Sequence, residues 1–124
     1  MERNESEIIM NLYNELIQSK IHPIPQIGKI DRTTNHGVYI IYGPNDDVLH
    51  VGMARSGIGG LNQRLNDHLL NKSSFYRGYL GKKNISLRQN HKFRYLEIED
   101  LRTRALVESL TAGLLCPAHF GIEK

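Results

Sequence analysis

Two pairs of polar side chains in this sequence have types and spacings that suit proton transfer and anion binding. Arg64 and His68 lie four positions apart, so a helix would project both from one face. Tyr39 and His50 lie in two apolar runs joined by turn residues, so a hairpin would place them on neighbouring strands. A guanidinium can hold a phosphate oxygen, and an imidazole or a phenol can activate water and relay its proton. These residue types therefore suit hydrolysis of a phosphodiester bond.

Both pairs also have a structural interpretation, because exposed Arg and His are common on helices and Tyr often packs in a core. A further candidate is Glu108, the one carboxylate within the apolar segment ALVESLTAGLL. A glutamate in such a segment either faces solvent or turns inward because a cation needs it. One carboxylate, several waters and a substrate phosphate would bind Mg²⁺.

The segment from Leu69 to Leu96 is basic, with seven Lys or Arg residues and no Asp or Glu. Its cations and aromatic rings are Lys72, Phe75, Tyr76, Arg77, Tyr79, Lys82, Lys83, Arg88, Lys92, Phe93, Arg94 and Tyr95. Cations contact phosphates, and rings stack on sugars or unpaired bases, so the segment indicates nucleic-acid binding. The alternative is a solvated basic face whose aromatic side chains belong to the core.

Hydrophobic periodicity and turn residues predict six elements. These are a helix over 6–20, strands over 38–42 and 48–51, a helix over 61–70, a strand over 92–99 and a helix over 101–115. The leucine spacing predicts two buried rows, which are Leu61, Leu65 and Leu69 in one helix and Leu106, Leu110 and Leu114 in the last. Residues 72–91 show no period and are expected to be loop with a short helical turn.

The predicted fold is α+β, a small three-stranded antiparallel sheet flanked by helices, with an extra N-terminal helix. Residues 1–30 form that helix and a connector that contains prolines, and residues 36–120 form the domain that carries the candidate site. A chain of 124 residues is long enough for a single core.

The composition, 40% hydrophobic and 23% charged, is typical of a globular protein and includes no apolar run long enough to span a bilayer. The acidic, amphipathic N-terminus does not resemble a secretory signal, so we expect a cytoplasmic protein with no membrane partner. The single cysteine, Cys116, excludes an intramolecular disulfide and a multi-cysteine zinc site.

In their order and spacing, the candidate residues resemble the GIY-YIG nuclease superfamily. The stretch Gly37, Val38, Tyr39 and, after ten residues, His50, Val51, Gly52 looks like the paired-strand signature, with His for the second Tyr. Arg64 with His68 matches the family's arginine helix, and Glu108 resembles its metal-binding glutamate. The resemblance runs from about His36 to Pro117 and implies a nuclease domain over residues 36–120.

This resemblance implies a DNA endonuclease, a phosphodiester hydrolase that uses one Mg²⁺ or Mn²⁺ ion per site. Tyr39 would be the general base or water activator, His50 would share in proton transfer, and Glu108 would bind the metal. Arg64 would hold the scissile phosphate, and His68 would support the nucleophile or the phosphate. The residues expected to bind substrate are Arg55, Lys72, Arg77, Lys82, Lys83 and Arg88.

The chain departs from the family pattern at His50 and near its end, where Phe120 occupies the place of a late Asn and His119 could substitute. These departures keep open an alternative, a DNA-binding module on the same fold that has lost cleavage. A structural domain that meets acidic proteins is a third possibility. A symmetric cutter of both DNA strands would need two copies or two successive nicks, so a homodimer is possible.

Overall fold

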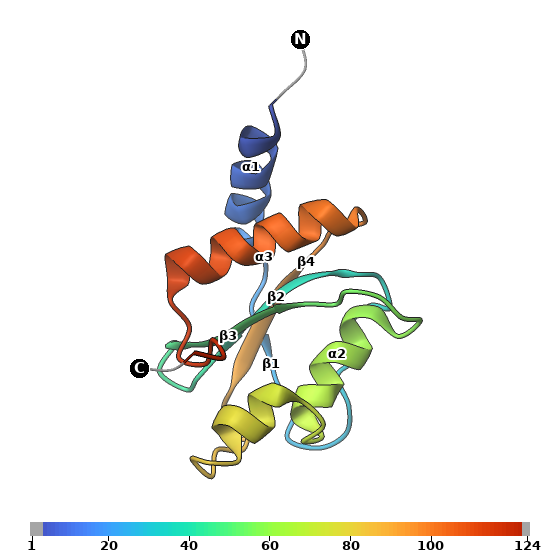
Figure 1. The fold of residues 1–124 in the computed structure, drawn as a ribbon. Coiled ribbons are helices and arrows are strands. Elements are labelled where there is room, and N and C mark those ends of the chain that lie inside the picture. The colour runs from blue at the N-terminus through green and yellow to red at the C-terminus, as the bar shows by residue number, and fades with distance from the viewer. Residues whose placement is uncertain (1–3, 123–124) are drawn as a thin grey trace.

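The computed structural model describes residues 4–122 of the chain (Figure 1). In chain order its elements are helix α1 (Glu5–Gln18), strands β1 (His22–Pro23), β2 (Gly37–Tyr42) and β3 (Val48–Met53), helix α2 (Gly60–Leu69), the π-helical turn η1 (Tyr76–Leu80), strand β4 (Lys92–Glu97) and helix α3 (Leu101–Leu115). The α+β class is confirmed, and the predicted helices and longer strands are present with ends shifted by up to two residues. The expected helical turn within 72–91 is η1.

The antiparallel sheet has four strands in the order β1-β4-β2-β3, so the prediction of three strands is wrong. The extra strand, β1, lies inside the predicted connector and pairs with β4 through His22 opposite Phe93. Only two residues long and ending in Pro23, it is too short to show a period of two. Proline lacks an N–H group, and an edge strand such as β1 tolerates that loss.

The central strand β2 explains how the sheet separates two cores. Val38 and Ile40 point to one face and Tyr39 and Ile41 to the other, and all four are at most 1% exposed. A strand buried on both faces is continuously apolar, which accounts for the run GVYIIY. β2 pairs with β3 on one side and β4 on the other.

Helices cover both faces of this sheet (Figure 1). The face that carries Val38 and Ile40 packs against α1 and α3, and Ile9 and Leu16 bring α1 into that core. The face that carries Tyr39 packs against α2 and η1. The leucine row predicted for α2 is confirmed, because Leu61, Leu65 and Leu69 are all buried in this second core.

The row predicted for α3 is wrong. Its buried residues are Arg104, Val107 and Thr111, whereas Leu106 and Leu110 are half-buried and Leu114 is 54% exposed. Two of the buried residues are polar, so hydrophobicity alone misplaces the inner face. Each is compensated by hydrogen bonds: Thr111 Oγ1 donates to the Val107 carbonyl, and the Arg104 guanidinium donates to backbone carbonyls.

Among residues 4–122, no helix combines the length and apolar character that crossing a membrane requires.

Candidate active site

A buried hydrogen-bonded chain joins Tyr39, His68 and Ser73. The Tyr39 hydroxyl lies 2.5 Å from His68 Nε2, and His68 Nδ1 lies 2.7 Å from Ser73 Oγ. All three side chains are at most 2% exposed. Ser73 Oγ also accepts a hydrogen bond from the backbone N–H of Tyr76 at 3.2 Å. This chain connects β2, α2 and the start of the helical turn, and it fixes the imidazole plane.

The β2–β3 pairing places His50 beside this chain. Tyr39 lies opposite Gly52, and Ile41 lies opposite His50, so Tyr39 and His50 are diagonal neighbours on one face of the sheet. The His50 ring stacks on Phe75 with a centroid separation of 4.5 Å and an interplanar angle of 11°. Its centroid lies 4.9 Å from that of His68. The hairpin thus brings together Tyr39 and His50, which have ten residues between them in the sequence.

Gly52 leaves the space that the Tyr39 hydroxyl occupies. A Cβ at this position would overlap that hydroxyl and lie 3.1 Å from His50 Nε2. We expect Gly52→Ala to lower the free energy of unfolding by about 1 to 3 kcal/mol, because the overlap forces these side chains to move. Urea denaturation measures the change.

Gly113→Ala is the matched control, because a Cβ there meets nothing within 4 Å and the position is exposed in α3. It should raise the unfolding free energy by about 0.5 to 1 kcal/mol through helix propensity. Equal effects of the two substitutions would contradict the close approach at Gly52.

Arg64 and Glu108 both act on the Tyr39 hydroxyl, although their helices, α2 and α3, cover opposite faces of the sheet. Burial raises the pKa of the Tyr39 hydroxyl, the charge of Arg64 and a hydrogen bond from its side chain lower it, and the charge of Glu108 raises it. Burial also raises the pKa of Glu108, while the charges of Arg55 and Arg64 lower it. β3 is an edge strand, so side chains from α2 and α3 can meet beyond it. The structure therefore brings Tyr39, Arg55, Arg64 and Glu108 into one electrostatic neighbourhood.

A buried arginine that the sequence analysis missed holds the loop after β3. Arg104 Nη2 donates to the Arg55 carbonyl at 2.9 Å, and Nη1 donates to the carbonyls of Ile98 at 3.0 Å and Glu99 at 2.6 Å. The side chain of Arg104 is 5% exposed. The exposed side chain of Arg55 thus extends from a fixed backbone beside Glu108, four residues after Arg104 on α3.

Burial keeps the two site histidines neutral. It is the largest cause that lowers the pKa of His50 to about 3, and the charges of the nearby His119 and Arg64 contribute to the same value. It also lowers the pKa of His68 well below its ordinary value, with contributions from His50, Arg64 and His119. The ring of His119 lies 5.4 Å from that of His50, centroid to centroid, and is 8% exposed.

These lowered values predict loss of stability in acid. The unfolded chain binds a proton on each histidine near pH 6.5, whereas the folded protein binds one on His50 only near pH 3, so stability falls as pH decreases through this window. Each such histidine contributes a slope of about 1.4 kcal/mol per pH unit. Urea denaturation at several pH values between these limits measures the slope. His50→Gln should reduce it, and an unchanged slope would contradict the buried neutral state.

The other predicted substrate-binding residues lie on the segment between α2 and β4. Lys72, Arg77, Lys82 and Lys83 are exposed, and Lys83 Nζ lies 5.5 Å from the centre of the Tyr79 ring. Arg88 is half-buried, and its Nη1 donates to the Pro25 carbonyl at 3.2 Å. Four of these cations are thus open to solvent, while one guanidinium is anchored to the backbone.

The donor set at Glu108 suits a hard cation bound mainly through water and substrate. Within residues 4–122, no three or more His, Cys, Asp or Glu side chains are grouped to hold a metal ion. Zinc sites use at least three protein ligands, whereas Mg²⁺ keeps several waters and binds one or two carboxylates together with substrate phosphates. The half-buried carboxylate of Glu108 fits the second arrangement.

Two further residues that the sequence did not mark as part of the site, Ser73 and Phe75, hold His68 and His50 in place. Ser73 lies five positions after His68, in a segment without periodicity, so nothing in the local pattern marks it. Phe75 was noted only as an aromatic residue of the basic segment. No protein-family model matches the chain, and no curated protein matches it either.

Proposed function

We propose that this protein is a divalent-metal-dependent DNA endonuclease, a hydrolase that cleaves a phosphodiester bond through a GIY-YIG-type site. One observation carries the proposal: a phenol–imidazole pair, a second imidazole, a guanidinium and a carboxylate lie close enough to act on one another. They come from β2, β3, α2 and α3, and they are Tyr39, His68, His50, Arg64 and Glu108. Such a set offers proton transfer, phosphate binding and one oxygen ligand for a metal.

Tyr39 and His68 provide a path for the proton of an attacking water. With the imidazole proton on Nδ1, Ser73 Oγ accepts that hydrogen and Nε2 accepts the Tyr39 hydroxyl hydrogen. The phenol oxygen can then take a proton from water as its own proton passes to His68. Because burial keeps both groups neutral at rest, we propose that the transfer accompanies the attack on phosphorus.

Arg64 and Glu108 act on the phosphate. The guanidinium of Arg64 would hold two phosphate oxygens and neutralise charge that develops in the transition state. Glu108, waters and a phosphate oxygen would bind one Mg²⁺ or Mn²⁺ ion, which stabilises the charge on the leaving oxygen. Arg55, whose charge acts on Glu108, is placed to contact a neighbouring phosphate.

The experiment is nicking of supercoiled plasmid in Mg²⁺, in Mn²⁺ and in EDTA, together with DNA binding at about 50 and 200 mM salt. We expect nicking in either metal, none in EDTA, and binding that weakens with salt. Salt-dependent binding without nicking would replace the proposal with the DNA-binding module. Absence of both would contradict a role on DNA.

The partner in this proposal is DNA in the cytoplasm. One site per chain cuts one strand at a time, so a double-strand break requires a homodimer or two successive nicks. Analytical ultracentrifugation with and without DNA distinguishes these possibilities.

A further inference from the structure

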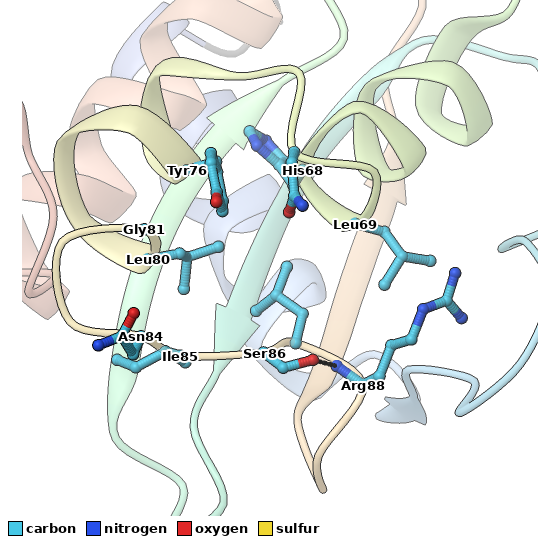
Figure 2. A pocket seen from close by; sticks show the side chains of 11 residues that line it. His68, Leu69, Tyr76, Leu80, Gly81, Asn84, Ile85, Ser86 and Arg88 are labelled. Atoms are coloured by element: carbon cyan, nitrogen blue, oxygen red, sulfur yellow. Dashed lines mark hydrogen bonds between the residues drawn. The ribbon is translucent and has the colours of Figure 1, made fainter.

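A pocket of about 340 Å³ opens between the end of α2, the turn η1 and the loop that follows it. His68, Leu69, Tyr76, Leu80, Asn84 and Arg88 are among the residues that line it (Figure 2). Its size is at the lower end of the range for small-ligand sites. We propose that this pocket receives one unpaired base of the DNA strand. The inference deepens the proposed nuclease function, on which it rests, by naming the substrate class.

The side walls of the pocket suit the faces of a base. Tyr76 and Leu80 line one side and Leu69 lines the other, as Figure 2 shows. Proteins that take a base out of the stack hold it between aromatic or apolar side chains. Gly81 allows this wall to form, because a Cβ there would lie 3.1 Å from the Tyr76 ring.

Two side-chain amides in the lining suit the polar edge of a base. Asn71 and Asn84 are exposed residues that line the pocket, and within residues 4–122 neither amide has a hydrogen-bond partner. Both residues have left-handed backbone angles, φ +66° and +54°, which Asn tolerates better than most residues do. An asparagine amide both donates and accepts, so it can pair with the edge of an adenine.

Charge around the pocket suits a nucleotide rather than an uncharged ligand. The Arg88 guanidinium is anchored at the pocket by its hydrogen bond to the Pro25 carbonyl, which leaves its other N–H groups for a phosphate. The exposed Lys72 follows Asn71 directly in the chain. No Asp or Glu occurs between Leu69 and Leu96, the segment that forms most of the lining.

His68 links this pocket to the candidate active site. It lines the pocket and is also hydrogen-bonded to the Tyr39 hydroxyl. A base in the pocket would therefore lie beside the imidazole that receives the proton. Extrusion of a base is least costly where it is already unpaired, so the preferred substrate should be a duplex with an unpaired nucleotide near the cleavage position.

The test compares a duplex that carries a single unpaired adenine with the fully paired duplex, by fluorescence anisotropy in EDTA so that no cleavage occurs. The parent should bind the bulged duplex more tightly. Asn71→Gly and Asn84→Gly remove the amides without backbone strain, and each should weaken bulge binding about fivefold to tenfold with little effect on the paired duplex. Asn90→Gly is the matched control, because Asn90 is exposed, has φ +62° and does not line the pocket.

Equal affinity of the parent for both duplexes, or unchanged bulge binding in both pocket variants, would overturn the proposal. A different result would contradict the proposed nuclease function. If the protein binds the bulged duplex selectively but nicks no DNA in Mg²⁺, the base-binding pocket is supported and the nuclease function is contradicted. If it nicks DNA but binds both duplexes equally, the nuclease function is supported and the base-binding pocket is contradicted.

Discussion

Tyr39→Phe is expected to reduce the nicking rate about 100-fold to 1,000-fold while DNA affinity changes by less than about twofold. The substitution removes only the hydroxyl that lies 2.5 Å from His68 Nε2. A phenyl ring fills the same buried space, so the sheet and the phosphate-binding residues keep their positions. Because the hydroxyl acts on the proton of the attacking water, its loss affects turnover rather than binding.

Tyr42→Phe is the matched control for this prediction. Tyr42 lies on the same strand, but its ring packs in the core on the other face, with α1 and α3. The Tyr42→Phe variant should nick DNA at the rate of the parent protein. Single-turnover rates and anisotropy on the same labelled duplex separate rate from affinity, and circular dichroism checks the fold. A large loss of affinity in Tyr39→Phe, or an unchanged rate, would remove Tyr39 from the proton path.

Arg64→Ala should lower the nicking rate about 100-fold to 1,000-fold, the effect of removing one charged donor from a preorganised site. Arg64→Lys should recover only part of this loss, because an ammonium group replaces the charge but not the two-pronged geometry of the guanidinium. Rates at saturating DNA measure both variants.

Arg102→Ala provides the control for removal of a helical arginine. Arg102 is exposed on α3 and forms a salt bridge with Glu5, with its Nε 2.8 Å from Glu5 Oε2. Its loss should leave the nicking rate within about twofold of the parent, because exposed ion pairs contribute little. Equal effects of the two alanine substitutions would show that Arg64 has no special place at the phosphate.

Local patterns in the sequence predicted most of the elements because most carry a clear period or turn signal. The run around Tyr39 and the leucines of α2 are examples, and Asp100 caps α3 by accepting a hydrogen bond from the Thr103 N–H at 2.9 Å. β1 is only two residues long and gives no such signal. The inner face of α3 was misassigned because the buried Arg104 donates to the carbonyls of Ile98 and Arg55 outside the helix, which no helical period encodes.

The candidate site could be predicted as a set of residues but not as a network. Arg64 and His68 follow from helical spacing, so their shared face was foreseeable. The hairpin register was not, because a bulge between Ile41 and Tyr42 shifts the pairing and places His50 on the face of Tyr39. The bond from His68 to Ser73 and the stacking of His50 on Phe75 depend on how the irregular segment after α2 folds back. The contribution of α3 depends on β3 lying at the edge of the sheet, which is a property of strand order.

Nicking by Glu108→Gln is the most direct test of a metal-dependent site at the edge of β3. The substitution keeps the size of a half-buried side chain and removes the one carboxylate that acts on Tyr39 from α3. Supercoiled plasmid in Mg²⁺ is the substrate, and Glu15→Gln, an exposed position on α1, is the matched control. The account predicts that the parent and the control nick the plasmid, while Glu108→Gln is reduced at least about 1,000-fold. An inert parent, or a Glu108→Gln variant that nicks as fast as the parent, would contradict it.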